Sequence, residues 1–158
     1  MLLYLLRHGD AVESSSYHDS ERPLSETGIQ QAHAVARFFQ SSATPLDLII
    51  ASPLARAQQM AQPTRDALKV KEFLTSEYLV PYADHRQLFD LLGERKEESV
   101  LCVGHEPFMS NAIALLVFGE TSPHVEMKKA SLACIETIRP LKKFPATLKW
   151  LLTAKQMK

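Results

Sequence analysis

Short apolar segments that alternate with helical patterns are the feature that most restricts the fold of this chain. Each segment is bounded by polar residues, glycine or proline. They lie at residues 2–6, 47–51, 99–103, 132–138 and 148–152, with a weaker candidate at 71–75. Runs of this length and composition are typical of strands inside a sheet.

Helical patterns fill the intervals between these strands. The first helix is predicted to follow Ser25. Its apolar residues recur at three- and four-residue steps, at Ile29, Ala32, Ala36 and Phe39. A second helix is predicted over residues 53–68, with Pro53 in its first turn, and we expect Pro63 to kink or split it. Two further helices are predicted, over residues 87–95 and 107–118.

This order of elements predicts an α/β sheet with helical crossovers. The first three firm strands are expected to be parallel and buried on both faces. The last two are joined by residues 139–147, which are too few for a helical crossover, so we expect them to pair antiparallel. Residues 10–24 are rich in serine and are predicted to form a loop.

Composition excludes several classes of protein. The chain has 158 residues, 46% of them hydrophobic, which is the size and composition of one globular domain. Eighteen basic residues balance eighteen acidic ones, which argues against binding to nucleic acid or to an anionic membrane. The longest apolar run, at 112–118, is too short to cross a bilayer. Cys102 and Cys134 lie in strand-like runs, so we expect a reducing cytoplasm rather than a disulfide scaffold.

Three of the predicted strands run directly into basic and histidine residues. Arg7 and His8 follow the first strand, Arg56 comes shortly after the second, and His105 follows the strand at 99–103. The carboxyl ends of parallel strands share one edge of a sheet, and ligands bind there. A single histidine or arginine at such a place usually has an ordinary structural role. The coincidence of three strand ends favours a common pocket.

Two arginines and two histidines in one pocket are suited to phosphoryl transfer. Arginine forks bind phosphoryl oxygens, and a histidine can form a covalent phosphoryl intermediate. We expect a neutral His8 to attack phosphorus while Arg7, Arg56 and His105 hold the oxygens. Glycines beside both histidines, Gly9 and Gly104, permit close approach of the backbone.

Other phosphate chemistries lack support in the sequence. No GxxxxGKS/T segment is present, so a P-loop is not expected. The residue six positions after Cys102 is Phe108, and Cys134 has Arg139 only five positions on, so both cysteines are interpreted as core residues. The remaining histidines are scattered, and we expect them to be solvated: His18, His33, His85 and His124. We therefore expect no metal site and no cofactor.

Three motifs in this order resemble the histidine phosphatase superfamily, also called the phosphoglycerate mutase-like family. They are Arg7-His8-Gly9, Ser52-Pro53-Leu54-Ala55-Arg56-Ala57 and Gly104-His105-Glu106-Pro107. The short chain and the segment Arg22-Pro23-Leu24-Ser25-Glu26-Thr27-Gly28 resemble the SixA-type phosphohistidine phosphatases. The resemblance covers residues 2 to about 152. It implies one domain over residues 1–158, a three-layer α/β/α sandwich with a mostly parallel central sheet and an antiparallel C-terminal strand.

The resemblance also implies roles for individual residues. His8 is implied as the phosphorylated nucleophile, with Arg7, Arg56 and His105 binding the phosphoryl group. Arg22 matches an arginine of the SixA-like subfamily that lines the phosphate pocket, and a loop arginine that fixes the turn before the helix explains it equally well. Ser52 and Glu106 also match motif positions, and we interpret them as shaping the strand-to-helix turns.

The general acid is the point at which the chain departs from larger members of the superfamily. Those members carry a carboxylate in an insertion after the third strand, whereas residues 76–86 are short here. Asp84 is the best-placed candidate and would serve equally well as a helix N-cap. Glu77 is a second candidate. SixA-like members lack an obvious acid.

The sequence thus predicts a metal-independent phosphatase that acts through phosphorylated His8. The preferred substrate is phosphohistidine on a protein, by analogy with the subfamily. Two alternatives stay open: a phosphatase of small phosphorylated metabolites or nucleotides, and a catalytically silent module that binds phosphate. A mutase is less favoured, because the chain has little material for the enclosing lid that retains an intermediate.

Overall fold

The computed structural model of the chain describes residues 1–122, 124–141 and 145–157. Within these residues, the strands form one sheet in the order β3-β2-β4-β1-β5-β6. The strands are β1 (Leu2–Arg7), β2 (Leu48–Ala51), β3 (Glu72–Thr75), β4 (Ser99–Gly104), β5 (Leu132–Glu136) and β6 (Thr147–Leu152). The first four strands in the sheet order are parallel, and β5 pairs antiparallel with both β1 and β6. This confirms the predicted sheet, including the antiparallel pairing of the last two strands.

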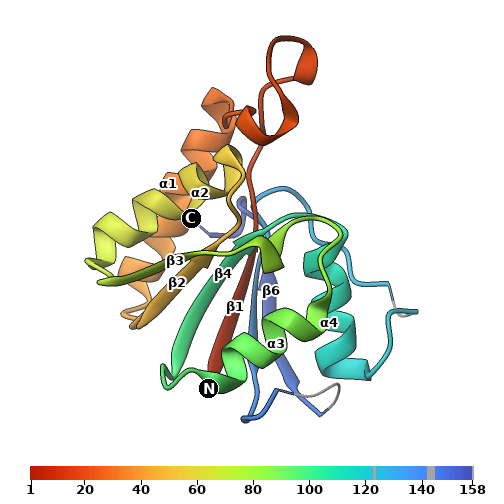
Figure 1. The fold of residues 1–158 in the computed structure, drawn as a ribbon. Coiled ribbons are helices and arrows are strands. Elements are labelled where there is room, and N and C mark those ends of the chain that lie inside the picture. Colours follow the sequence, from red (N-terminus) through yellow and green to blue (C-terminus); the bar gives the residue numbers. More distant parts are fainter. Residues whose placement is uncertain (123, 142–144, 158) are drawn as a thin grey trace.

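Helices cover both faces of the sheet, as the three-layer prediction requires (Figure 1). On one face lie α1 (Glu26–Ser41) and α2 (Ala55–Leu68), which pack through a core around Phe39 and Met60. On the other lie α3 (His85–Glu94) and α4 (Phe108–Phe118), with a core around Leu88 and Phe108. In the part of the chain that the structure describes, no helix is long and apolar enough to cross a membrane.

Alternation along β1 explains why both layers are needed. Leu3 and Leu5 belong to the core beneath α3 and α4, whereas Tyr4 and Leu6 belong to the core beneath α1 and α2. All four side chains are buried. Successive side chains of a strand point to opposite faces, so a strand that is apolar throughout must be covered on both sides.

Two details of the helices differ from the prediction. Ile29 is 48% exposed, because the buried stripe of α1 runs through Gly28, Ala32, Val35, Ala36 and Phe39 instead. Helix α2 continues through Pro63 to Leu68, so the predicted split does not occur. The buried face of α2 packs on α1 and the sheet, and this tertiary packing outweighs the loss of one helical hydrogen bond.

Three element boundaries also differ by two residues. Helix α2 begins at Ala55, so Pro53 precedes the helix and does not lie in its first turn. Helix α3 begins at His85, two residues before the predicted start, because Asp84 accepts a hydrogen bond from Arg86 N and caps it. Strand β5 ends at Glu136, and Ile138, which the sequence placed in this strand, is 74% exposed.

The parallel strands bring the three motifs to one edge of the sheet, here called the carboxyl edge. Arg7 is in register with Gly104, and Ala51 with Val103. The loop after β1, predicted at 10–24, rises above this edge and contains two short turns, η1 (Ser14–Ser16) and η2 (Asp19–Glu21) (Figure 1). A third short turn, η3 (Glu77–Leu79), lies between β3 and α3.

Candidate active site

The four predicted pocket residues lie together at the carboxyl edge. Arg7 ends β1 and His8 follows it, Arg56 lies in the first turn of α2, and His105 follows β4. The rings of His8 and His105 have their centroids 5.0 Å apart. The charges of Arg7 and Arg56 lower the pKa values of both histidines, which places all four groups in one electrostatic cluster.

His8 is held in a defined tautomer. Its Nδ1 lies 2.7 Å from Gly9 O, and a carbonyl oxygen only accepts, so Nδ1 carries the hydrogen and Nε2 keeps its lone pair. Burial, together with the charges of Arg56 and Arg7, lowers the pKa of His8 to about 4, although the bond to Gly9 opposes this shift. Near neutral pH, His8 therefore presents an unprotonated Nε2.

His105 is buried and is positioned by Ser52. Its Nε2 lies 2.8 Å from Ser52 Oγ, which also accepts a hydrogen bond from Leu54 N. Burial and the neighbouring His8 and Arg56 lower the pKa of His105 to about 3. Among the described residues, His105 Nδ1 has no hydrogen-bond partner. Ser52 thus shapes its turn, as predicted, and also orients His105, a contact that the sequence reasoning missed.

The two arginines are anchored by backbone carbonyls. Arg7 Nη1 donates to Met127 O (2.7 Å), and its buried Nε has no partner among the described residues. Arg56 is 5% exposed, and its Nη1 donates to Asp19 O (2.7 Å). These anchors fix the direction of each guanidinium. A phosphoryl oxygen is a suitable acceptor for the buried donors that remain.

Asp19, which the sequence reasoning missed, connects the loop after β1 to the cluster. Its carboxylate accepts from Arg56 Nη2 (3.3 Å) and from Arg22 Nη1 (3.1 Å). Burial alone would raise the pKa of Asp19, but the bonds and charges of the two arginines hold it below its ordinary value. Arg22 also donates to Val12 O within the same loop (2.9 Å), and among the described residues its hydrogen bond toward the cluster is the one to Asp19.

Lys129 is a second residue that the sequence did not single out. Its Nζ donates to Asp10 Oδ1 (2.6 Å), and Asp10 Oδ2 accepts from Ser25 Oγ (2.6 Å). The charge of Lys129 also lowers the pKa of His8. Lys129 adds a further positive charge beside the cluster, which favours an anionic ligand.

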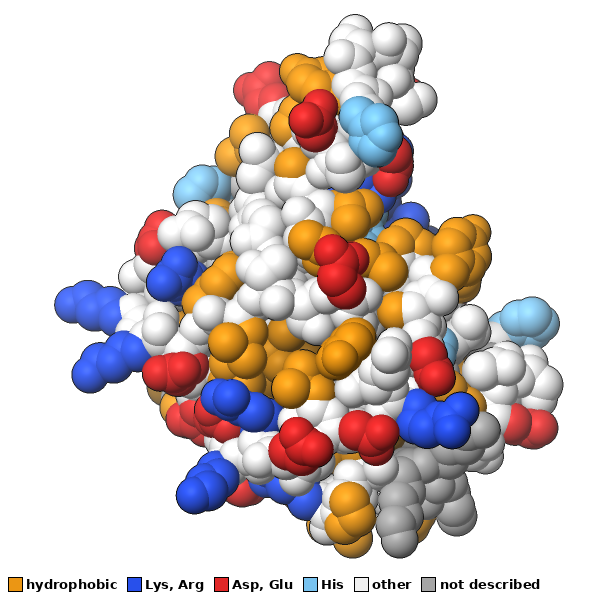
Figure 2. Space-filling model, in the orientation of Figure 1, with side chains coloured by type: hydrophobic (Ala, Val, Ile, Leu, Met, Phe, Trp, Pro, Cys, Tyr) orange, Lys and Arg blue, Asp and Glu red, His pale blue; other side chains and the backbone are white. Residues whose placement is uncertain are grey.

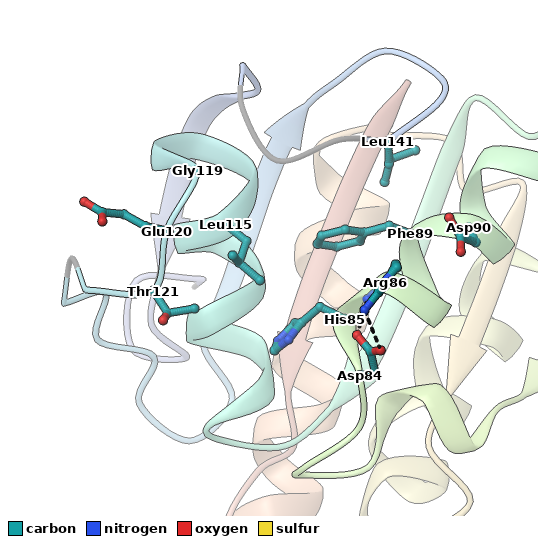
Figure 3. Close-up of a pocket in the computed structure, with 10 residues that line it drawn as sticks. All are labelled: Asp84, His85, Arg86, Phe89, Asp90, Leu115, Gly119, Glu120, Thr121 and Leu141. Atoms are coloured by element: carbon teal, nitrogen blue, oxygen red, sulfur yellow. Dashed lines mark hydrogen bonds and ion pairs between the residues drawn. The ribbon is translucent and has the colours of Figure 1, made fainter.

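The structure does not place Asp84 in this cluster. Asp84 caps α3 and lines a cavity of about 650 Å³ between α3 and α4, to which none of the four pocket residues contributes (Figure 3). Its neighbour His85 stacks on Phe108, with ring centroids 4.1 Å apart, and its Nε2 donates to Phe108 O (2.9 Å). The prediction that His85 is solvated was therefore wrong. Glu77 is exposed in η3.

Other candidate groups are structural. Glu106 accepts from Ser110 N (2.9 Å) in the first turn of α4, in agreement with its predicted role in the turn. Both cysteines are free and buried in the cores. Of the residues described, no three His, Cys, Asp or Glu side chains gather as a metal site would require.

The lowered histidine pKa values predict that stability falls in mild acid. Between the folded pKa values, about 4 and about 3, and the ordinary value near 6.5, the unfolded chain binds protons that the folded chain does not. The free energy of unfolding should therefore drop by on the order of 4 kcal/mol, about 2 kcal/mol for each histidine, as pH falls from about 6.5 to about 4.5. Urea denaturation measures this. In the His8→Gln/His105→Gln variant, most of this change of stability with pH should disappear, whereas the His33→Gln control should show the same change as the wild type. If the wild type were equally stable at both pH values, the prediction would be contradicted.

Comparisons with known proteins agree with this geometry. The sequence model of the Histidine phosphatase superfamily (branch 1) matches residues 3–79. An uncharacterised protein of Picosynechococcus sp. is 30% identical over 149 residues, which cover 84% of this chain and 82% of that protein. The protein histidine phosphatase SixA, solved in complex with tungstate, superposes with a TM-score of 0.86 at 25% identity and covers 100% of both chains.

A SixA structure from Agrobacterium tumefaciens has the same fold, with a TM-score of 0.79 at 22% identity over 96% of this chain and 97% of that one. The matches to the family and to SixA extend over the elements that carry Arg7, His8 and Arg56, and the SixA match continues through His105. This chain belongs to branch 1 of the histidine phosphatase superfamily.

Proposed function

We propose that this chain is a phosphatase that acts through a phosphohistidine intermediate on His8, and that its substrate is phosphohistidine on a protein. The observation that carries the proposal is the state of His8. Its Nδ1–H is held by Gly9 O at 2.7 Å, and its pKa of about 4 leaves Nε2 unprotonated. A neutral imidazole of fixed tautomer is the form in which histidine acts as a nucleophile.

In the first step, His8 Nε2 attacks phosphorus. A bond forms between Nε2 and phosphorus, the bond from phosphorus to the substrate nitrogen breaks, and its electron pair leaves with the substrate ring. Arg7, Arg56 and His105 supply donors for the three non-bridging oxygens, whose charge rises in the transition state. The unpartnered Arg7 Nε and His105 Nδ1 support this assignment. The likeness to a SixA that binds tungstate supports a phosphate-bearing substrate.

In the second step, water attacks the phosphorus of phosphorylated His8. The bond between phosphorus and Nε2 breaks, and its electron pair returns to His8. The water gives one proton to a phosphoryl oxygen and becomes a hydroxyl group of the inorganic phosphate that leaves. The same arginines and His105 hold the oxygens. Neither step requires a metal ion or a cofactor.

The leaving group explains the choice of phosphohistidine. An alkyl ester leaves as an alkoxide and needs a positioned acid, whereas an imidazole is protonated near neutral pH with little help. Asp84, the predicted acid, lines a different cavity. Asp19 is bonded to two arginines, and these bonds keep its side chain as a carboxylate. A site in which neither Asp84 nor Asp19 is placed to donate a proton favours phosphohistidine over phosphoserine.

One observation favours the alternative of a small phosphorylated metabolite. A cavity of about 470 Å³ beside the cluster is lined in part by Arg7, Glu106, His124 and Lys128. A polar leaving group of modest size would fit such a space.

A substrate panel tests the choice between these functions. We expect kcat/KM for phosphohistidine and for an aryl phosphate to exceed that for phosphoserine or a sugar phosphate by about 10²-fold or more, the usual contribution of a general acid. Asp84→Asn should leave all these rates unchanged. Rapid hydrolysis of a sugar phosphate that collapses in Asp84→Asn would instead favour the metabolite phosphatase and restore Asp84 as the acid. Failure to hydrolyse any substrate would favour the silent phosphate-binding module.

A further inference from the structure

Exposed tyrosines gather at the carboxyl edge of the sheet. The chain has four tyrosines, and Tyr4 is buried in the core. The other three, here called the aromatic rim, are Tyr17, Tyr78 and Tyr82, with exposed fractions of 44%, 37% and 89%. Tyr17 lies on the loop that follows β1, and the other two lie between β3 and α3, so all three belong to segments that leave the carboxyl edge.

The loop with Tyr17 is attached to the catalytic cluster. No residue from 13 to 21 is buried, so packing contributes little to holding this part of the loop. Asp19, two residues after Tyr17, is bonded to Arg56 through both its backbone oxygen (2.7 Å) and its carboxylate (3.3 Å). Tyr17 is thereby tethered beside an arginine of the pocket.

The segment with Tyr78 and Tyr82 is packed onto the strand end that precedes His105. Leu79 is buried, and its carbonyl oxygen would lie 2.8 Å from a Cβ added at Gly104. Only glycine permits so close an approach. Ser76 N also donates to Ala51 O (2.9 Å), at the end of β2. These contacts hold the segment that carries Tyr78 and Tyr82 at the carboxyl edge, where the loop with Tyr17 also begins.

Figure 2 shows a hollow on this edge. Basic side chains (Lys or Arg) and histidine lie within it, and apolar side chains lie beside it. Exposed apolar side chains also occur away from this edge. Ile138 follows β5, whose Glu136 is in register with Leu2, and it therefore lies at the opposite edge of the sheet. Tyrosine combines a large apolar ring with a hydroxyl and loses little entropy on binding, which is why it is enriched in protein interfaces.

We propose that the aromatic rim is the docking surface for the protein that carries the phosphohistidine. The proposal rests on the proposed function. A small ester is bound mainly through its phosphoryl group, whereas a protein that presents a phosphohistidine also covers the surface around the pocket. A permanent second copy of this chain on the rim would block access to His8. A phosphorylated protein that docks transiently brings its own phosphoryl group to that residue.

The test compares two substrates in two variants. The substrates are an isolated phosphotransfer domain phosphorylated on histidine, and an aryl phosphate. In the Tyr17→Ala/Tyr82→Ala variant, kcat/KM for the phosphorylated domain should fall by about tenfold or more, the usual effect of truncating aromatic anchors. The value for the aryl phosphate should not change, because the pocket itself is intact. Ile138→Ala, which removes an exposed apolar side chain at the opposite edge, should change neither value.

The outcomes separate the docking surface from the proposed function. If the wild type does not hydrolyse the phosphorylated domain, the proposed function fails, and the docking surface fails with it. If the wild type hydrolyses the phosphorylated domain and the tyrosine variant hydrolyses it equally fast, only the docking surface is contradicted. Equal losses for both substrates would show that the tyrosines support the pocket rather than a partner. A wild-type dimer that Tyr82→Ala dissociates in size-exclusion chromatography would identify a second copy as the occupant and overturn the proposal.

Discussion

Replacing His8 with alanine is expected to lower kcat by roughly 10⁴-fold or more, because the variant has no atom that can accept the phosphoryl group. No other side chain of the cluster can substitute for it. His105 is held by Ser52 through Nε2, its Nδ1 is the donor in the proposed mechanism, and both arginines are permanently charged donors. Steady-state turnover of an aryl phosphate measures the loss.

Trapping the intermediate makes this prediction specific. Rapid quenching of the wild type with radiolabelled substrate should yield an acid-labile phosphoenzyme, and His8→Ala should yield none. His33→Ala removes an exposed histidine from α1 and is the matched control, with wild-type turnover and labelling expected. Labelled His8→Ala protein, or substantial turnover by it, would assign the nucleophile to another residue. Thermal unfolding of the variant checks that the fold is intact.

Truncation of Arg56 should lower kcat by about 10²–10³-fold, the effect of removing one preorganised donor from developing charge. Arg56→Lys should recover only part of this loss, because lysine lacks the planar fork with which Arg56 bonds Asp19 and, in the proposed mechanism, also a phosphoryl oxygen. Arg86→Ala is the matched control, because Arg86 is an exposed arginine at the separate cavity between α3 and α4.

Inhibition by inorganic phosphate provides a second readout for Arg56. Phosphate should bind more weakly to Arg56→Ala than to the wild type, and equally well to Arg86→Ala and the wild type. A chelator should change none of these rates. Activity that is lost in chelator and restored by a divalent ion would contradict a mechanism in which arginines alone supply the positive charge.

The fold and most of the cluster could be predicted because each depends on local sequence. Apolar runs such as the one before Arg7 mark buried strands, and parallel strands end at one edge. Any polar residue directly after such a run is therefore brought to that edge, whatever its distance along the chain. This reasoning placed His8 and His105 together although 97 positions separate them in the sequence.

The missed residues depend on contacts between exposed segments, which have no periodic pattern. Asp19 lies in a serine-rich loop, and its bond to Arg56 follows from the path of that loop in space. One signal was present: Asp19 and Arg22 are three positions apart and carry opposite charges. The predictions for Ile29 and His85 were wrong because the sequence does not show which side chains in the first turn of a helix pack against another element. In the structure, Ile29 faces solvent and His85 meets Phe108.

The position of β1 in the sheet determines when the catalytic cluster can form during synthesis. The neighbours of this strand, β4 and β5, begin at Ser99 and Leu132, so both lie late in the chain. The segment with Arg7 and His8 leaves the ribosome early and stays unpaired until those strands have emerged. Native contacts of such long range form slowly and expose apolar strands in the meantime. A nascent chain that stops before β4 thus carries His8, the proposed nucleophile, without His105, and phosphatase activity would report that β4 and β5 have emerged and paired with β1.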